Sequence, residues 1–197
     1  MAVGILERLG RLLWGFPPNL MRPIVEQLGS IRALLWFVRN MPRYERTLQV
    51  VGPVRTHLLC TVISLHNGCR YCAYGHAYAL DLVLYRDRNQ VLPVDAATLA
   101  TWTGLPAGEL RERLSTLLQQ AKLHVEVLWV DRALAMAGGG QRPIDSTEAR
   151  VAHLVRMFAT LNRVGIAGDV EPDEAHDPAN KDTGLRRRHA EYRAALA

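Results

Sequence analysis

Cysteine is scarce in this sequence, and long apolar runs are missing from it. Only 3 of the 197 residues are cysteines, an odd and small number that excludes the disulfide framework of a small secreted protein. The longest apolar run, 58–65, includes Thr61 and Ser64 and is far shorter than the ~18 residues of a membrane span. The first residues lack the basic start, apolar stretch and cleavage site of a secretory signal. We therefore expect a cytoplasmic protein in a reducing environment, without a membrane partner.

The charge of the chain is also mild. Its net charge is +5, from 24 Lys and Arg against 19 Asp and Glu, and the basic residues are scattered apart from the run at 186–188. Nucleic acid binding requires basic side chains gathered on one stripe with aromatic partners, so we expect no nucleic acid partner. Hydrophobic residues make up 49 % of the chain, which is enough for a sizeable core in a single domain over 1–197.

Helical periodicity is what the sequence has in abundance. Apolar residues recur at helical spacing in nearly every segment, and no convincing alternation predicts a strand. A helix beginning near Arg22 is expected to end at Asn40, because Met41-Pro42 follows it. Further helices are predicted over about 54–65, 69–85, 96–101, 107–120, 124–136, 146–164 and 185–196, with an acidic loop between the last two.

The fold class that follows is all-α. We expect a core over about 20–167, with extra helices at both ends. The helix over 1–16 is predicted to pack on the core or on a neighbouring subunit. The extension over 168–197 has no predicted role.

The segment Cys69-Arg-Tyr-Cys72-Ala-Tyr-Gly-His76 is the most informative part of the chain. Its two cysteines and its histidine fall within a narrow arc of one helix face. A CxxC pair in a reducing environment is typical of a redox or metal site, and its two sulfurs can form a disulfide with little movement. Asn67-Gly68 predicts a turn just before this helix, so Cys69 lies in the first turn, where free N–H groups and the helix dipole favour a thiolate.

The preceding helix is predicted to face this segment. Because a tight turn centred on Asn67 folds the two helices into a hairpin, His57 should lie level with His76, and Cys60 should lie near Cys72. We therefore predict a partly buried site formed by Cys69, Cys72, His76 and His57 and edged by Cys60, Thr61 and Ser64.

The other candidate side chains receive structural interpretations. Cys60 is interpreted as a small core residue. Four tyrosines on the opposite face of the CxxC helix are expected to pack against another helix or another subunit; they are Tyr71, Tyr74, Tyr78 and Tyr85. The remaining histidines are interpreted as satisfied or exposed residues; they are His66, His124, His153, His176 and His189.

The run from Leu65 to His76 resembles the alkylhydroperoxidase D (AhpD)-like and carboxymuconolactone decarboxylase superfamily. The typical pattern in that superfamily is a helix, an Asn-Gly turn and then Cys-x-Tyr-Cys-x-x-x-His. The segment 158–164 also resembles its final core helix. The resemblance extends over about 20–167, and the CxxCxxxH block is its specific part.

This resemblance implies a helical bundle with a central hairpin carrying the CxxC motif, assembled as a trimer or hexamer. It implies a dithiol–disulfide cycle without a cofactor, in which Cys72 attacks, Cys69 is its partner and His76 belongs to a proton relay. The implied partners are a small hydroperoxide or disulfide substrate and a protein thiol as electron donor. The decarboxylase branch usually lacks the cysteine pair, which argues against lactone decarboxylation.

One position departs from the pattern of this superfamily. Its relay normally starts at a glutamate twelve residues before the first cysteine, and His57 stands there in this chain. A histidine can still move protons, because its reference pKa of about 6.5 suits the task. It cannot supply a fixed negative charge, so a neutral His57 would hold His76 less firmly as the cation. Peroxidase efficiency is the property that this change affects.

Three functions remain in competition. The first, which we favour, is a thiol-dependent antioxidant oxidoreductase, either an alkylhydroperoxidase-like peroxidase or a disulfide reductase. The second is a Cys2His2 zinc site made of Cys69, Cys72, His76 and His57. The third is a non-enzymatic helical oligomer whose thiols are vestigial or sense the redox state.

Overall fold

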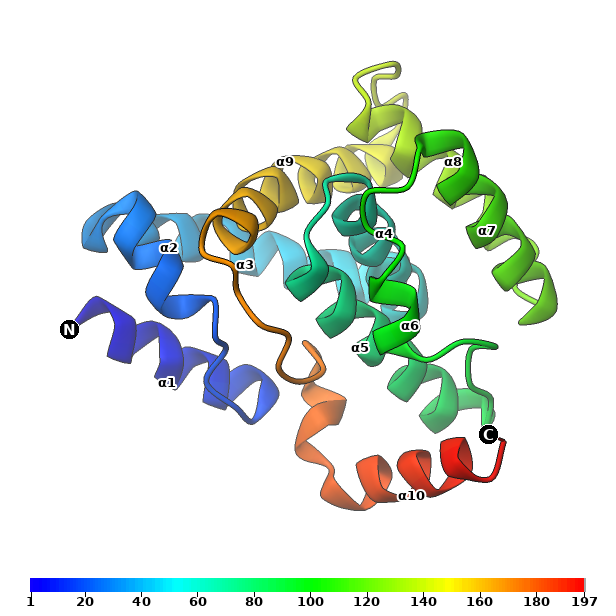
Figure 1. Ribbon diagram of the computed structural model, residues 1–197. Helices are drawn as coiled ribbons and strands as arrows, with labels where there is room; N and C mark the ends of the chain where they lie inside the picture. Colours follow the sequence, from blue (N-terminus) through cyan, green and yellow to red (C-terminus); the bar gives the residue numbers. More distant parts are fainter. Residues whose placement is uncertain (197) are drawn as a thin grey trace.

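The computed structural model describes residues 1–196, and those residues form helices and connecting segments without a strand (Figure 1). This confirms the all-α prediction. The α-helices are α1 (Ala2–Trp14), α2 (Met21–Leu28), α3 (Ser30–Val51), α4 (Pro53–His66), α5 (Arg70–Arg88), α6 (Ala96–Ala100), α7 (Ala107–Gln120), α8 (Glu126–Ala137), α9 (Ser146–Ala167) and α10 (Thr183–Ala194), and a short 3-10 helix, η1, covers Pro178–Lys181.

The hairpin of α4 and α5 forms the centre of the molecule. Helix α4 is buried around its whole circumference over 56–65. The chain reverses at Asn67 and Gly68, where Cys69 N–H donates to the carbonyl of Ser64 at 2.9 Å. Gly68 has a φ of 82°, a conformation that glycine adopts without strain. The turn predicted at Asn67-Gly68 is therefore present.

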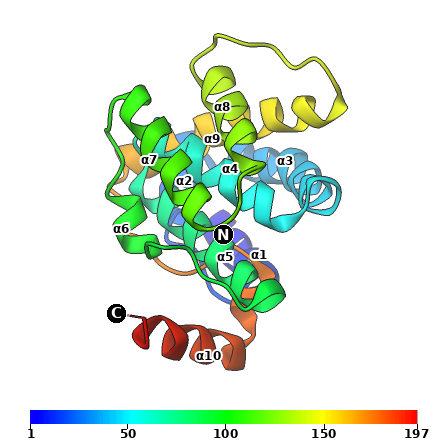
Figure 2. The ribbon, with the colours of Figure 1, turned by 90° about the vertical axis from the view of Figure 1, so that its right-hand side faces the viewer.

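The other helices pack around this hairpin. Helices α3, α8 and α9 contact α4, while α6, α9 and α10 contact α5. In Figure 1, α9 crosses above the hairpin and α7 and α8 lie to one side of it. The turned view in Figure 2 shows α10 lying below the rest of the bundle. Among the residues described, no helix is both long and apolar enough to cross a membrane.

The prediction of one helix ending before Pro42 is wrong in two respects. The helical segment is interrupted earlier, at Gly29, whose φ of 80° and ψ of 152° lie outside the helical region. Helix α3 then continues through Pro42 as far as Val51. A proline inside a helix loses one hydrogen bond. The helix persists here because its flanks are anchored in the core by Phe37 and Tyr44.

The C-terminal extension folds back on the hairpin. Residues 168–177 run as a connecting segment, orange in Figure 1, that passes between α1 and α5. The backbone N–H of His176 donates to the carbonyl of Gly75 in α5 at 3.1 Å. Helix η1 then packs on α1 and α5, and α10 packs on α5. The extension thus covers the face of α5 that follows the CxxC motif.

Candidate active site

The two cysteines of the motif lie at the start of α5. Cys69 is the residue that precedes the first turn, with extended backbone angles. The side chains of Cys69 and Cys72 are almost fully buried, with 1 % and 2 % of each residue exposed. Both are free thiols, as is Cys60 in the core of α4. The structure therefore places a reduced CxxC pair inside the bundle, at the N-terminal end of a helix.

The two thiols have opposite pKa shifts. Interaction with the Cys72 thiol, helped by the N–H groups of Tyr71 and Cys72, lowers the pKa of Cys69 to about 7. Interaction with the Cys69 thiolate, together with burial, raises the pKa of Cys72 well above its ordinary value. The pair therefore shares one proton, and the negative charge rests on Cys69 because that sulfur faces the free amides at the start of the helix.

Helix α9 supports the thiols from the other side. The Asn162 side chain lowers the pKa of both cysteines, and it is held by hydrogen bonds to Asn67 at 2.8 Å and to Ser64 at 3.1 Å. One turn further along, a Cβ at Gly165 would lie 2.8 Å from the Cys69 sulfur. The close approach of α9 to the thiols therefore requires glycine at this position.

The predicted histidine pair is present. Nδ1 of His57 lies 3.1 Å from Nδ1 of His76, and the two rings are stacked. His57 is fully buried and His76 is 5 % exposed. Burial, with the nearby His176 and His57, lowers the pKa of His76 well below its ordinary value, so its ring is neutral near pH 7. The hairpin register that places residue 57 level with residue 76 is thus correct.

An acidic residue completes this pair from the C-terminal segment. Nε2 of His57 lies 2.8 Å from Oδ2 of Asp177. Burial of Asp177 opposes its ionisation, but the hydrogen bond and charge of His57, together with the Ala179 N–H and the Arg86 charge, lower the pKa of this carboxyl group. The histidine pair therefore ends at a buried, ionised carboxylate.

The tautomers of the two rings follow from this network. Because His57 donates Nε2–H to the carboxylate, its neutral form has a lone pair at Nδ1. His76 then donates its own Nδ1–H to that lone pair and keeps Nε2 as its basic atom. Asp177, His57 and His76 form a continuous path for a proton.

The interpretation of His176 as an isolated satisfied residue misses its position at the site. Its ring lies 5.2 Å from the ring of His76 and stacks on Trp14 and Phe16. Its Nε2 lies 3.1 Å from Asp173, which also accepts a hydrogen bond from the Tyr71 hydroxyl at 2.9 Å. The apolar residues of this segment do not repeat at helical or strand spacing. Its sequence therefore does not predict that it packs beside the thiols.

The tyrosine face of α5 is covered by the same extension. Tyr71 packs on His176, while Tyr78 and Tyr85 pack on His189 of α10. The sequence predicts that this face packs against another helix or against another subunit. In the structure, Tyr78 and Tyr85 pack against a helix of the same chain, α10.

A small cavity of about 40 Å³ lies beside the second cysteine. Cys72, His76 and His176 line it, together with Tyr44 and apolar side chains of α1, α2, α3 and α9. The hydroxyl of Tyr44 is buried and has no hydrogen-bond partner among the residues described. Burial, and then the nearby Cys60, raises the pKa of Tyr44 well above its ordinary value, so this hydroxyl is a neutral donor. Cys69 does not line the cavity.

A metal centre has no geometric support in the described part of the chain. No group of three or more His, Cys, Asp or Glu side chains over 1–196 is arranged so that it could hold a metal ion. The second histidine of the proposed zinc set, His57, instead uses both ring nitrogens, one toward His76 and one toward Asp177.

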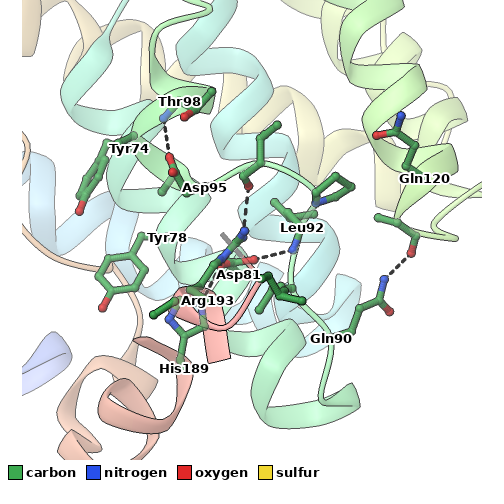
Figure 3. Close-up of a pocket in the computed structure, with 18 residues that line it drawn as sticks. Tyr74, Tyr78, Asp81, Gln90, Leu92, Asp95, Thr98, Gln120, His189 and Arg193 are labelled. Carbon is green, nitrogen blue, oxygen red and sulfur yellow. Dashed lines mark hydrogen bonds and ion pairs between the residues drawn. The ribbon is translucent and has the colours of Figure 1, made fainter. Parts of the chain in front are cut away.

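A larger groove, of about 850 Å³, lies away from the thiols between α5, the segment after it and α10 (Figure 3). At its base the carboxylate of Asp81 accepts hydrogen bonds from Leu92 N–H at 2.7 Å, His189 at 2.7 Å and Arg193 at 2.6 Å. These bonds satisfy Asp81 and fasten α10 to α5. His189 is therefore a satisfied structural residue, as expected, and this groove is not assigned to the thiol chemistry.

Comparisons of the chain with protein-family models, with curated proteins and with solved structures each returned no match.

Proposed function

We propose that the protein is a thiol peroxidase of the AhpD-like type, which reduces small hydroperoxides with the Cys69–Cys72 pair. The observation that carries this proposal is the cavity beside Cys72. It brings together a thiol, the basic nitrogen of a histidine relay and the unpartnered Tyr44 hydroxyl. A buried hydroxyl without a partner is unfavourable, and a bound oxygen atom would satisfy it.

The size of the cavity favours a small substrate. A volume of about 40 Å³ exceeds what one water molecule needs and is far below that of a typical drug-sized pocket. Hydrogen peroxide and short alkyl hydroperoxides fit this space. A protein disulfide does not reach thiols that are only 1 % and 2 % exposed.

The first chemical step uses the shared proton of the pair. When that proton moves from the Cys72 sulfur to Cys69, the negative charge lies at the cavity. The Cys72 thiolate attacks the terminal peroxide oxygen, the O–O bond breaks, and the leaving alkoxide takes a proton from Nε2 of His76. The products are a Cys72 sulfenic acid and an alcohol.

The relay supplies that proton without charging His76. When the thiol pair ionises, Nε2 of His76 takes up the released proton, and Nδ1 of His76 passes its own proton to His57 beside Asp177. The donor and acceptor roles of the two rings are then reversed. His57 returns this proton by donating Nδ1–H to His76 while His76 donates Nε2–H to the substrate. The Tyr44 hydroxyl donates a hydrogen bond to the leaving oxygen.

The second step closes the disulfide. The sulfur of Cys69 attacks the sulfenic acid sulfur, and the Cys69 proton leaves with the hydroxyl group as water. Two thiols and one hydroperoxide thus give one disulfide, one alcohol and one water. A small-molecule dithiol reductant then returns the pair to its starting state.

Intact-mass spectrometry with thiol alkylation tests the proposal. Reduced protein is treated briefly with stoichiometric hydrogen peroxide, denatured and alkylated. We expect loss of two alkylation sites, a Cys69–Cys72 disulfide peptide, and full reversal by a dithiol. In Cys69→Ser, the sulfenic acid on Cys72 should form more slowly, because no second thiol takes up the Cys72 proton. Once formed, it should persist and be trapped by a dimedone-type reagent.

Cys60 serves as the internal control, because it lies in the core and takes no part in the cycle. It should be alkylated after denaturation in every sample. If Cys69 and Cys72 also remain fully alkylated after peroxide treatment of folded wild-type protein, the proposal is wrong.

A further inference from the structure

A stripe of basic residues follows one face of α3 and faces α9. The stripe repeats at helical spacing from residue 32 to residue 43, so its side chains lie on one side of the helix. Together with two residues of α9 they line a groove of about 420 Å³. The lining residues are Arg32, Leu35, Trp36, Arg39, Asn40, Arg43, His153 and Arg156.

The four arginines of this groove are exposed and lack acidic partners. None of them forms an ion pair within residues 1–196, whereas Arg55, Arg111 and Arg132 each pair with a carboxylate. Four guanidinium groups around one groove repel one another unless an anion lies between them. Burial lowers the pKa of His153, and the nearby charges of Arg43 and Arg156 lower it further.

His153 provides a second, independent indication of a ligand. The histidine is 8 % exposed, and its Nδ1 is buried without a hydrogen-bond partner in the described part of the chain. Its Nε2 lies 3.1 Å from Oδ1 of Asn40, whose amide nitrogen donates to the Trp36 carbonyl at 2.8 Å. This orientation of Asn40 makes Nε2 the protonated nitrogen, so Nδ1 is an acceptor that lacks a donor.

We propose that this groove binds a small phosphate-type anion, either a phosphate monoester or a diphosphate. The planar fork of an arginine matches the oxygens of a phosphate group, and several such forks favour more than one phosphate charge. A singly protonated phosphate also carries the O–H that Nδ1 of His153 lacks. The groove therefore fits both the charge and the protonation state of this ligand class.

The shape of the groove favours a small anion over a nucleic acid strand. Its volume falls within the usual range for small-molecule sites. Strand-binding proteins use successive aromatic platforms along an extended basic channel, and Trp36 is the one aromatic residue lining this groove. Trp36 also lines the thiol cavity, so the two sites share a wall.

Calorimetric titration of the full-length protein with inorganic pyrophosphate tests the proposal. At near-physiological salt we expect saturable binding of one pyrophosphate per chain. Arg39→Gln, Arg43→Gln and Arg156→Gln should each weaken it about tenfold, since each removes one charge-assisted hydrogen bond. These variants should keep the wild-type melting temperature, because the exposed side chains form no ion pairs.

Arg88→Gln is the matched control, because Arg88 is an exposed arginine at the end of α5 that does not line the groove. Its affinity should stay within about twofold of wild type, since charges beyond about 8 Å are screened at this salt. Equal losses of affinity in Arg88→Gln and the groove variants would mean that only net charge matters, and would overturn the site.

His153→Gln separates the histidine from the arginines. Glutamine can keep the bond to Asn40 but has no equivalent of Nδ1. Wild type should bind phosphate more tightly than sulfate, which carries no proton near pH 7, and His153→Gln should lose this preference. Absence of saturable pyrophosphate binding would overturn the proposal. If the protein bound a single-stranded oligonucleotide but not pyrophosphate, the groove would be a nucleic acid site instead.

Discussion

His57 and Asp177 lie 120 residues apart in the chain, and their side chains meet at 2.8 Å inside the bundle. This contact joins the central hairpin to the C-terminal segment and turns a histidine pair into a path that ends in a buried carboxylate. The carboxylate beside position 57 thus comes from a distant part of the chain.

Replacing that carboxylate tests the relay. In Asp177→Asn the shape is kept and the charge is lost, so the His57 tautomer is no longer fixed. We expect the rate of peroxide reduction to fall about 10- to 100-fold and its pH profile to change, because general acid–base catalysis contributes effects of this size. Stopped-flow measurement of thiol oxidation against pH provides the check.

Asp169→Asn is the control for this variant. Asp169 is exposed in the same segment and has a φ of 42°, a conformation that asparagine tolerates. Its rate and pH profile should match wild type. An unchanged pH profile in Asp177→Asn would exclude Asp177 from the relay even if the overall rate fell.

The thiol pair should ionise as a unit. Ultraviolet absorbance of the thiolate should rise with a midpoint near the pKa of Cys69, about 7. In Cys72→Ala the midpoint should move up toward an ordinary thiol value of about 8.5, because the main stabilising partner of the thiolate is gone. In Cys69→Ala no thiolate should form near pH 7, since burial raises the pKa values of Cys60 and Cys72. A thiolate midpoint near pH 7 in Cys69→Ala would contradict this assignment, because the thiolate would then be on Cys72.

Tyr44→Phe removes a single hydroxyl that has no partner in the folded protein. Stability should stay the same or rise slightly, because an unsatisfied buried polar group is lost. Peroxide reduction should slow by about tenfold, as expected for the net loss of one neutral hydrogen bond, here to the leaving oxygen. Thermal melting and stopped-flow kinetics measure the two effects separately, with Tyr85→Phe, which packs on α10, as the control. If Tyr44→Phe reduced peroxide at the wild-type rate, this hydroxyl would have no role in the mechanism.

Local sequence patterns predict the hairpin and part of its chemistry. The turn at Asn67 and Gly68 and the period of the two flanking helices suffice to bring His57 level with His76 and to place Cys69 at the start of α5, one residue earlier than the predicted first-turn position. These predictions succeed because they depend on residues close in sequence whose relative positions are set by helix geometry.

The remaining parts of the site depend on packing between distant segments. Asp177 and His176 belong to a segment without periodicity, so no local pattern indicates where they dock. Tyr44 reaches the cavity only because α3 continues through Pro42, where local preference predicts an end. The arginine groove likewise requires α3 and α9 to lie side by side, and scattered basic residues in a sequence do not show this.

Stability should fall when the buried histidine must take up a proton. Burial, then His176 and His57, lowers the pKa of His76 in the folded state, whereas an unfolded histidine titrates near 6.5. Below about pH 6.5 the unfolded state therefore binds more protons, and the free energy of unfolding falls by up to ~1.4 kcal/mol per pH unit for one such group. The lowered pKa of Asp177 acts in a separate window, below about pH 4, where the unfolded carboxyl group also becomes protonated.

Urea unfolding of the reduced protein at several pH values between about 8 and 5 checks this prediction. His76→Gln should show a smaller loss of stability over the same range, while His124→Gln, at a site outside the bundle core, should follow wild type. Equal stability of the wild-type protein across this range would mean that His76 takes up a proton in the folded state as readily as in the unfolded state.

Gly75 tests how tightly the C-terminal segment packs on α5. A Cβ at this position would lie 2.5 Å from the ring of His176. The ring cannot move aside easily, because it stacks on Trp14 and Phe16. In addition, the backbone N–H of His176 donates a hydrogen bond to the carbonyl of Gly75 itself. Alanine favours a helix over glycine by about 1 kcal/mol, but overpacking of a filled site costs about 1–3 kcal/mol, so Gly75→Ala should be destabilising.

The opposite result is expected for Gly4→Ala in α1, where nothing lies within 4 Å of the added Cβ. That variant gains helix propensity without a clash and should be more stable by about 0.5–1 kcal/mol. Urea unfolding compares the two substitutions, and limited proteolysis near residues 168–177 shows whether Gly75→Ala releases the segment. Because the segment carries Asp177, its release should also slow thiol oxidation, which Gly4→Ala leaves unchanged. If Gly75→Ala were as stabilising as Gly4→Ala, His176 would not be packed against α5, and the relay would lose its carboxylate.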